Sequence, residues 1–393
     1  MKSRDINLDV RDSHADTLLS FRFHRKKNSI AFFASRQKNT NKLLCSAGME
    51  DSEKQPSCSC MKLAADGFKR VSMAQVSALF LGSLVIVGLL FSYGYNREGW
   101  NDFFSFDGFA SSEDAGLDDV LKRASTENKT VILTIINKAY TENDSMLELF
   151  LQGLQQGEET QPLIQHLLLV AVDQAAFNRC QEIHPHCYRL STGGVDFSGE
   201  ELFMSKYYLD MMWRRLLFVA AVVRRGYNVV FTDADILWFR NPFPRFSLDD
   251  DVQISCDRYN GRPYDTSNAI NAGFYFVRSN IKTIKLYKLW YKSKDIGIHE
   301  QDVLQKLQTK DSFKKLGLKF RFLNTQYFAG FCQTSTDMRE VNTMHANCCK
   351  SLKAKMADLS AFYGAWKNFT ATTGHNTTTG TWPDAKACHA SWG

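Results

Sequence analysis

Between residues 130 and 324 the chain alternates short apolar runs with stretches of helical periodicity, and this alternation limits the fold more than any other feature. Apolar runs rich in β-branched and aromatic residues predict buried strands. Those runs are TVILTIIN (130–137), LLLVAVD (167–173), HCYRL (186–190), YNVVFTDAD (227–235), DVQISC (251–256), GFYFVRS (273–279) and KFRFLN (319–324). Helical patterns lie between them, at 145–156, 206–225, 281–291 and 300–309. The alternation predicts an α/β fold with a single mixed sheet and helices on both sides.

The second constraint is a stretch without charged residues from Val71 to Asn96, whose centre, residues 73–95, is strongly apolar. At about 1.5 Å per residue, a helix over this centre would span the roughly 30 Å hydrocarbon core of a bilayer. Lys and Arg outnumber Asp and Glu by 14 to 8 over residues 1–70, which accounts for the whole formal net charge of +6. Because positive flanks stay cytoplasmic, the sequence predicts a type II signal-anchor.

Four regions follow from this topology. We expect a disordered cytosolic tail (1–70), one transmembrane helix (73–95), a short luminal stem (96–115) and a luminal catalytic domain (116–393). Since the basic excess lies in the tail, no basic surface on the globular part predicts binding to nucleic acid.

Glycosylation motifs and cysteines agree with a luminal domain. All N-x-[ST] motifs follow the apolar segment, at Asn128, Asn143, Asn368 and Asn376. Seven of the ten cysteines also follow it, and disulfides persist in an oxidising lumen. Cys180 and Cys187 are close enough in sequence to close a loop, and an odd number leaves at least one thiol free or paired with another chain in a homo- or hetero-oligomer.

The stretch FTDADILWFRNPF (231–243) places Asp233 and Asp235 where a buried strand leaves the sheet. That edge is where open α/β sheets bind ligands. Two residues apart on an extended backbone, both carboxylates can approach one divalent cation, Mn²⁺ or Mg²⁺. The competing interpretation is an ordinary turn or helix cap. Neither a G-x-G-x-x-G nor a P-loop motif is present, so a nucleotide diphosphate would need such a cation.

Four blocks together resemble a known family. They are LDMMWRRLLFVAAVVRRGYNVVFTDADILWFRNPF, INAGFYFVRSN, HEQDVLQKL and MHANCCKSL, in this order. They are similar to the plant nucleotide-diphospho-sugar transferases of glycosyltransferase family 77, which includes extensin arabinosyltransferases and rhamnogalacturonan xylosyltransferases. The likeness covers roughly residues 115 to 365. It implies a GT-A fold in the Golgi lumen, a divalent metal, and sugar transfer that retains the anomeric configuration.

The resemblance implies metal and phosphate contacts. Asp233 and Asp235 match the metal-binding D-x-D, and His345 matches a late histidine that completes the metal shell, the alternative being a structural histidine. Neighbouring helix positions point about 100° apart, so at most one of Arg214 and Arg215 is expected to face the diphosphate. Lys206 is a further donor-binding candidate.

The resemblance also implies contacts to the sugar. Asn271, Gly273 and Gln301 match donor-binding positions, with an ordinary turn as the alternative for the first two. Glu300 stands where the family pattern leads us to expect Asp. Either Glu300 or Asp302 is the expected carboxylate on the reacting face of the sugar, unless it only caps the helix.

The predicted function is therefore a Golgi glycosyltransferase. It would move a sugar, a pentose such as arabinose or xylose, from a UDP-sugar to a cell-wall polysaccharide or glycoprotein. Two alternatives stay open: a catalytically inactive glycan-binding relative, and a nucleotide-sugar hydrolase. The missing glycine motif disfavours a nicotinamide-dependent oxidoreductase.

Overall fold

The structure is a computed structural model of the chain, and it describes residues 25–26, 29–30, 114–142, 144–372 and 380–392. Backbone contacts divide the chain into two units, Met1–Leu89 and Leu90–Gly393. The described residues of the first unit form an antiparallel pair, β1 (Arg25–Lys26) with β2 (Ser29–Ile30). The expected membrane segment, most of the tail and most of the stem lie outside the described residues. Among the helices that are described, none is both long and apolar enough to cross a membrane.

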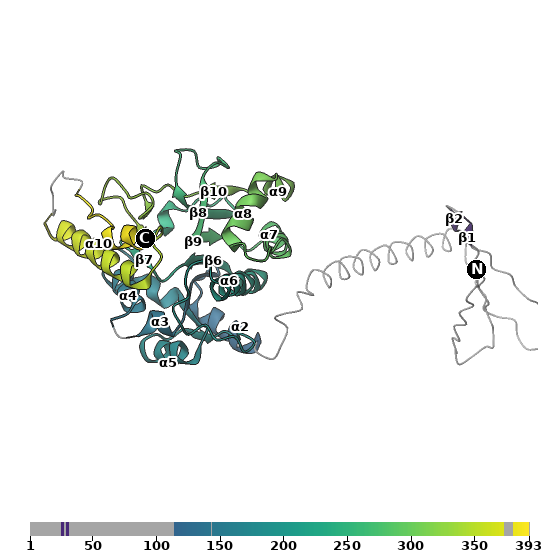
Figure 1. Cartoon of the computed structure of the whole chain (residues 1–393). Coiled ribbons are helices and arrows are strands. Elements are labelled where there is room, and N and C mark those ends of the chain that lie inside the picture. Colours follow the sequence, from purple (N-terminus) through teal and green to yellow (C-terminus); the bar gives the residue numbers. More distant parts are fainter. Residues whose placement is uncertain (1–24, 27–28, 31–113, 143, 373–379, 393) are drawn as a thin grey trace, which may run out of the picture. The chain divides into compact units, whose positions relative to one another are not determined.

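The second unit is built on a seven-stranded sheet in the order β10-β8-β9-β6-β3-β4-β5 (Figure 1). Its strands are β3 (Thr130–Ile136), β4 (Leu167–Ala171), β5 (Cys187–Arg189), β6 (Asn228–Thr232), β8 (Val252–Arg258), β9 (Ala269–Val277) and β10 (Phe320–Phe322). β9 runs antiparallel to both of its neighbours, and the other pairings in this sheet are parallel. The predicted mixed sheet is confirmed.

Because β9 runs opposite to β6 and β8, its beginning lies at the edge of the sheet where these two strands end. Thr232, the last residue of β6, pairs with Phe274, so Gly273 lies beside Asp233. Two motifs forty residues apart in sequence therefore meet at one edge of the sheet.

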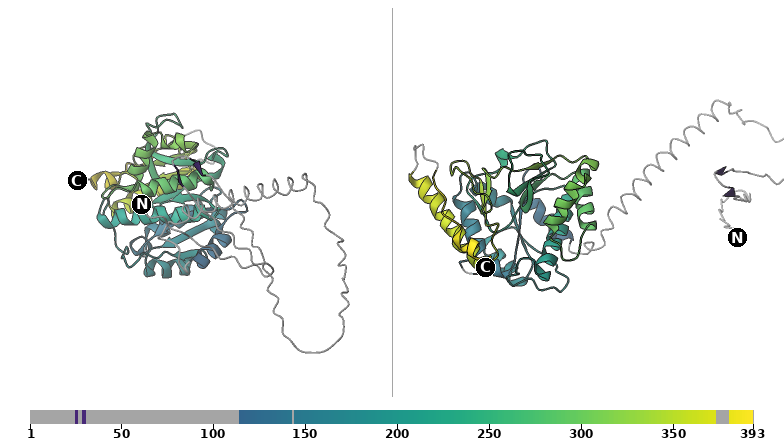
Figure 2. Two further views of the ribbon diagram at one scale, coloured as in Figure 1. Left: turned by 90° about the vertical axis from the view of Figure 1, so that its right-hand side faces the viewer. Right: turned by 45° about the horizontal axis from the view of Figure 1, so that its top comes forward.

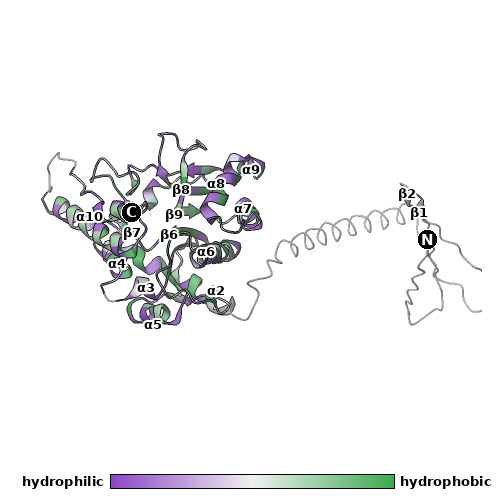
Figure 3. Ribbon diagram, viewed as in Figure 1, coloured by the Kyte–Doolittle hydropathy of each residue, from purple (hydrophilic) through white to green (hydrophobic). Residues whose placement is uncertain are grey.

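Alternate residues of the central strands face opposite cores. In β3, Val131 and Leu133 pack in one hydrophobic cluster and Ile132 in another. Both faces are covered, which is why β3 and β4 read as continuous apolar runs and not as alternating ones. Figure 3 shows this apolar character in strands β6 and β9.

Helices cover both faces, as predicted. The first cluster includes residues of α2 (Asp114–Ala124), α6 (Lys206–Arg224), α7 (Ile281–Lys292) and α8 (Glu300–Thr309), whereas α4 (Met146–Gln156) and α5 (Gln174–Ile183) contribute to the second. Shorter helices complete the chain: α3 (Lys138–Thr141), α9 (Ser312–Lys315), α11 (Lys386–Ala390), and the 3₁₀ turns η1 (Gln161–His166) and η2 (Phe243–Arg245). α2 begins two residues inside the stretch expected to be stem.

The expectation of a single sheet was wrong for this unit. A second sheet of three short strands joins β11 (Phe328–Gly330), β12 (Thr343–His345) and β7 (Ile236–Trp238), in that order. The long helix α10 (Leu352–Thr372) packs against it through a third cluster that also contains residues of α4, and the views of Figure 2 keep α10 at one flank of this unit. Phe239 stacks between Trp366 and Trp382, with ring centroids 4.9 and 5.6 Å away.

Three disulfides are present in the described part of the chain. Cys180 pairs with Cys187, as the sequence suggested. The adjacent residues Cys348 and Cys349 pair with Cys332 and Cys388, respectively. Cys256 is a buried free thiol, in agreement with the odd number of cysteines.

Candidate functional site

The two aspartates of the D-x-D motif lie in the turn between β6 and β7, which belong to different sheets. The Asp233 amide donates to the carbonyl of Gly273 (2.7 Å), and the Ala346 amide donates to the carbonyl of Asp235 (3.1 Å). In the small sheet, His345 pairs with Ile236. One ligand atom from each of Asp233, Asp235 and His345 then lies within 4.8 Å of the other two. We refer to these three residues as the acidic cluster.

Gly273 forms one wall of the acidic cluster. A Cβ at this position would lie 2.5 Å from His345 Cε1 and 2.8 Å from Asp233 Oδ2, closer than real Cβ atoms approach other heavy atoms. Glycine is required because the backbone itself approaches the cluster. The prediction that Gly273 permits a close approach thus has a concrete geometric basis.

Arg215 connects the acidic cluster to helix α8. Its guanidinium donates to Asp233 Oδ1 (2.7 Å) and to Glu300 Oε1 (2.5 Å). Burial would raise the pKa of Glu300, but Arg215 and His299 together outweigh burial and lower this pKa. Glu300 is therefore a buried anion that orients Arg215, and its longer side chain spans the gap between α8 and α6.

The buried position of Glu300 corrects one prediction. Only 1% of Glu300 is accessible, and Asp302 is exposed in the first turn of α8, where it complements the helix dipole. Glu300 is enclosed by Arg215 and His299, whose Nε2 lies 3.1 Å from Glu300 Oε2. Glu300 is thus committed to Arg215 and presents no free carboxylate to a sugar, while the sugar-facing role of Asp302 stays a prediction.

Two other predicted basic residues do not join the cluster. Lys206 is exposed and pairs with Asp210 one turn along α6 (3.0 Å). Arg214 points away from Arg215, with its guanidinium near Gly193 and over the Phe197 ring. As expected for adjacent helix positions, only one of the two arginines faces the cluster.

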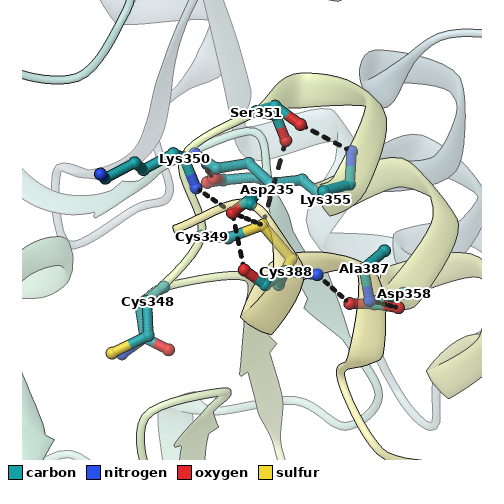
Figure 4. The surroundings of a disulfide bond; sticks show 12 residues. Asp235, Cys348, Cys349, Lys350, Ser351, Lys355, Asp358, Ala387 and Cys388 are labelled. Carbon is teal, nitrogen blue, oxygen red and sulfur yellow. Dashed lines mark hydrogen bonds and ion pairs between the residues drawn. A yellow bond between two sulfur atoms is a disulfide. The ribbon is translucent and has the colours of Figure 1, made fainter. Parts of the chain in front are cut away.

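Lys355, which the sequence did not single out, reaches the cluster from α10. Its Nζ lies 2.8 Å from Asp235 Oδ2 (Figure 4). On the other side of this carboxylate, His345 Nε2 lies 3.4 Å from Asp235 Oδ1. Burial would raise the pKa of Asp235, but Lys355 and His345 overcome this and hold it well below its usual range. Burial would lower the pKa of Lys355, but Asp235 and Tyr140 together outweigh burial and raise this pKa. Both groups are therefore charged near neutral pH.

Asn271 and Gln301 satisfy backbone groups where β9 is irregular. The pairing of β9 with β8 shifts between Ile254 and Ser255. In this interval, Ala272 N donates to Gln301 Oε1 (2.7 Å) and Gly273 N donates to Asn271 Oδ1 (3.0 Å). Each amide oxygen thus replaces a missing ladder partner. Asn271 thus adjoins the acidic cluster beside Gly273, and Gln301 holds the amide of the preceding residue, Ala272.

Asp257 is the second residue that sequence reasoning missed. It follows the strand DVQISC directly, as Asp233 follows its own strand, so a signal was available. Its Oδ1 accepts from Asn271 Nδ2 and Asn347 Nδ2, both at 2.8 Å. A carboxylate close to the acidic cluster therefore comes from β8.

The acidic cluster fits a divalent cation. Two carboxylates and an imidazole are oxygen and nitrogen donors that Mn²⁺ accepts, and carboxylates also suit Mg²⁺. Asp233 is 30% exposed at its side chain, so the cluster is open on one side, whereas Asp235 is 5% exposed. Lys355 and Arg215 add positive charge beside it. Such an arrangement can bind an anion that also ligates the cation, as a diphosphate does.

Comparison with known proteins gives the family. Residues 162–359 match the family model described as nucleotide-diphospho-sugar transferase. An uncharacterised protein of Arabidopsis thaliana is 44% identical over 279 residues, which is 70% of this chain and 73% of the relative.

Two relatives with named activities are more distant. A UDP-galactose:fucoside alpha-3-galactosyltransferase of Dictyostelium discoideum is 30% identical over 38% of this chain and 27% of its own length. The beta-arabinofuranosyltransferase RAY1 of Arabidopsis thaliana is 34% identical over 21% of this chain and 16% of its own.

A solved structure of mouse xyloside xylosyltransferase 1 aligns with 56% of this chain and 98% of its own at 12% identity, with a TM-score of 0.37. The family match includes every strand of the seven-stranded sheet except β3, and it includes all three residues of the acidic cluster. The chain therefore belongs to the nucleotide-diphospho-sugar transferase family, and it is a glycosyltransferase of the α/β, GT-A-like type that uses a nucleotide-sugar donor.

Proposed function

We propose that this glycosyltransferase moves a pentose from a UDP-pentose to a cell-wall polysaccharide or glycoprotein, in a cation-dependent reaction that retains the anomeric configuration. The observation that carries the proposal is the acidic cluster at the carboxyl end of β6, with its three ligand atoms within 4.8 Å and two cationic side chains beside it.

Asp233, Asp235 and His345 would hold the cation, with Mn²⁺ favoured over Mg²⁺ because one ligand is an imidazole. When bound, the cation would act as a Lewis acid that stabilises the negative charge of the departing diphosphate. Gly273 keeps the space beside these ligands clear, and Arg215 fixes the position of Asp233.

Lys355 supplies a mobile positive charge. Its Nζ is 2.8 Å from Asp235 at the end of a flexible stem, and an ammonium group can turn from this carboxylate to a phosphate oxygen without leaving the site. Arg215 cannot do the same, since its two ends are already bonded to Asp233 and Glu300. We assign leaving-group stabilisation to Lys355 and a positioning role to Arg215.

Retention of the anomeric configuration agrees with the side chains at the acidic cluster, because neither His345 nor His299 is free to act as a general base. The two His–carboxylate pairs that adjoin it are His345 with Asp235 and His299 with Glu300. His345 is a metal ligand in this proposal. His299 is 6% exposed and stacks with Tyr208, so it is not presented as a base. In same-face substitution, the acceptor oxygen bonds to the anomeric carbon as the sugar–phosphate bond breaks. The acceptor proton then passes to an oxygen of the leaving diphosphate, and no protein base is needed.

The two relatives with named activities are named for different sugars, galactose and arabinofuranose. We favour the pentose because the plant relative acts with arabinofuranose and because the sequence blocks resemble plant pentosyltransferases. A hexose donor is the competing outcome, and one or two hydrogen bonds in the pocket would decide between them.

We also propose a Golgi location with a single-pass type II topology. The uncharged segment at 73–95 and the basic excess before it support this orientation. Two glycosylation sites in the described region, Asn128 and Asn368, are exposed. The lumen would also maintain the three disulfides.

The test is thermal unfolding of the full-length protein in detergent, with UDP-arabinofuranose, UDP-xylose and UDP-galactose, each with and without Mn²⁺. A ligand that binds the folded state raises the melting temperature according to its concentration relative to its Kd. We expect a Mn²⁺-dependent shift with one UDP-pentose that Asp235→Asn abolishes.

Donor turnover without acceptor tests the two alternatives. Slow hydrolysis of the stabilising donor is expected of a transferase, whereas full-rate hydrolysis would indicate a nucleotide-sugar hydrolase. A folded protein that no donor stabilises would support an inactive glycan-binding relative.

A further inference from the structure

A β-bulge directs Asp257 toward the reaction site. The register of β8 against β9 pairs Cys256 with Ile270 and Arg258 with Ala269, which leaves Asp257 without a cross-strand partner. Bulges re-aim a side chain and are frequent beside active sites. The Asp257 side chain contacts Asn271, the residue of β9 that pairs with Ser255.

Two asparagines hold one oxygen of Asp257 in place. Asn271 Nδ2 and Asn347 Nδ2 both donate to Asp257 Oδ1 at 2.8 Å. Asn347 is itself fixed, because its Oδ1 accepts from Cys332 N (3.1 Å). The Cys332 sulfur lies 3.6 Å from Asp257 Oδ1, but it is in a disulfide and has no hydrogen to donate.

The other oxygen of Asp257 is available. Within the described part of the chain, Oδ2 has no hydrogen-bond partner, and the residue is half-buried. Asp257 does not belong to the group of residues whose ligand atoms could share one cation. It is thus a rigidly held acceptor of hydrogen bonds outside the acidic cluster.

Asn271 joins this carboxylate to the acidic cluster. Its Oδ1, together with Asp233 Oδ2 and His345 Cε1, lies within 3.0 Å of the point that a Cβ on Gly273 would occupy. Asn271 is 7% exposed and has both of its polar ends engaged, with Gly273 N on one side and Asp257 on the other. It therefore positions Asp257 and is not the residue that reaches the sugar.

We propose that Asp257 Oδ2 accepts a hydrogen bond from a hydroxyl of the transferred sugar, and so orients the sugar beside the diphosphate held at the acidic cluster. This inference rests on the proposed function, and it moves the sugar-facing carboxylate from helix α8 to strand β8. A carboxylate fixed in one place accepts a hydrogen bond only from a sugar hydroxyl at the matching position. Asp257 therefore helps to determine which UDP-sugar the enzyme binds.

Comparing UDP with UDP-sugars tests the proposal, because UDP lacks the sugar. For the wild type, UDP with Mn²⁺ should stabilise the full-length protein, and the preferred UDP-sugar should stabilise it further. In Asp257→Asn, binding of UDP with Mn²⁺ should be unchanged, while the UDP-sugar should bind roughly 10- to 100-fold more weakly, as expected when a hydrogen bond to a charged group is lost. Asp257→Glu keeps the charge but displaces the carboxylate oxygen. It should therefore lose the same part of the UDP-sugar affinity while keeping its affinity for UDP.

The matched control is Asp311→Asn. Asp311 is exposed, and its φ of 58° is a left-handed conformation that asparagine adopts readily, so donor binding should not change. Donor hydrolysis gives a second readout, and Asp257→Asn should raise KM for the UDP-sugar.

The outcomes separate this inference from the proposed function. If the wild type is not stabilised by UDP with Mn²⁺, the proposed function fails. If UDP binds but Asp257→Asn retains the full additional effect of the UDP-sugar, the assignment of Asp257 is overturned. An equal loss of UDP and UDP-sugar binding would also overturn it, since the effect would then lie at the diphosphate.

Discussion

Gly273 carries the tightest constraint among the residues of the site. The three heavy atoms nearest to a Cβ at this position belong to the acidic cluster or its support: His345 Cε1, Asp233 Oδ2 and Asn271 Oδ1. The position is closed by side chains that must themselves stay in place, so a methyl group cannot be absorbed by a flexible neighbour.

We therefore expect Gly273→Ala to abolish the Mn²⁺-dependent rise in melting temperature and to destabilise the fold by about 1–3 kcal/mol, the usual cost of overpacking. Gly364→Ala is the control, because its Cβ meets nothing within 4 Å in helix α10. There alanine should be neutral or stabilising by up to about 1 kcal/mol. Thermal unfolding with and without Mn²⁺ measures both variants. Retention of the Mn²⁺ effect in Gly273→Ala would mean that the cluster is not the cation site.

Lys355 and a cation compete for Asp235. Replacing Lys355 by Gln removes a positive charge next to the ligands, so Mn²⁺ alone should bind roughly tenfold more tightly, the effect of a unit charge a few ångströms away in a partly solvated site. Turnover should nevertheless fall, since the leaving diphosphate loses a counter-charge. Titration with Mn²⁺ and a donor assay test the two opposite effects.

Lys350→Gln is the control for Lys355. Lys350 is exposed on the same segment and lies over the Trp392 ring, so both measurements should stay at wild-type values. Weaker Mn²⁺ binding in Lys355→Gln would contradict the competition and would make Lys355 a purely structural partner of Asp235.

At the scale of elements, two disulfides clamp the segment that joins β12 to α10. His345 directly precedes this segment, and Lys355 follows it in the first turn of α10. Its adjacent cysteines are bonded to different partners, Cys348 to Cys332 and Cys349 to Cys388, and Figure 4 shows the second of these bonds. The Cys388 amide also donates to Asp358 Oδ2 (2.7 Å) on α10. The segment is thus held to both the small sheet and the C-terminal helix.

Removing the Cys349–Cys388 bond by substitution of both residues with Ser should weaken Mn²⁺ binding by roughly tenfold, as is usual when the support of a metal ligand is lost. The pair Cys180→Ser/Cys187→Ser is the control, because that disulfide joins α5 to β5 and holds no residue of the cluster. In both double variants the free energy of unfolding should fall by about 2–4 kcal/mol, the usual contribution of a disulfide. Equal Mn²⁺ affinities for the two would show that this clamp serves the fold alone.

The elements also show what a sequence can reveal. The strands of the large sheet were predictable, because strands buried on both faces have continuous apolar sequences such as LLLVA. Three-residue strands such as β7 and β12 are too short to show any period, so the second sheet was missed. Lys355 was missed as a consequence, because it reaches Asp235 only when α10 packs on that second sheet. The place of Asp257 after DVQISC was visible in the sequence, but the direction of its side chain depends on a bulge, which is a property of the register between two strands.

At the scale of the whole molecule, the reversed strand β9 explains why one edge of the sheet collects the chemistry. Parallel strands alone would deliver only their carboxyl ends, such as Asp233 after β6 and Asp257 at the end of β8. Reversal adds the amino end of β9, with Asn271 and Gly273. The resemblance pointed to several of these residues, and the structure brings them together at this edge of the sheet.

The proposed topology makes a prediction for the entire chain. Glycans are attached at N-x-[ST] motifs in the lumen, so the type II orientation requires that sites after residue 95 be modified. Asn128 and Asn368 are both exposed, and Asn128 uses its Oδ1 to accept from Thr126 and Thr130, which leaves Nδ2 for a glycan. We expect glycosidase treatment of the full-length protein from plant cells to reduce its mass.

Single-site variants make this measurement specific. Asn368→Gln and Thr370→Ala destroy the same motif through different residues, so each should remove one and the same glycan, and Asn128→Gln should remove another. Because both sites lie on the carboxyl side of the uncharged segment, modification of either one requires that side to enter the lumen. If the mass does not change on glycosidase treatment while the protein is folded and active, the orientation is reversed or the chain never enters the secretory pathway. The disulfides of the site would then have to survive in a reducing compartment, where bonds of this kind are rarely maintained.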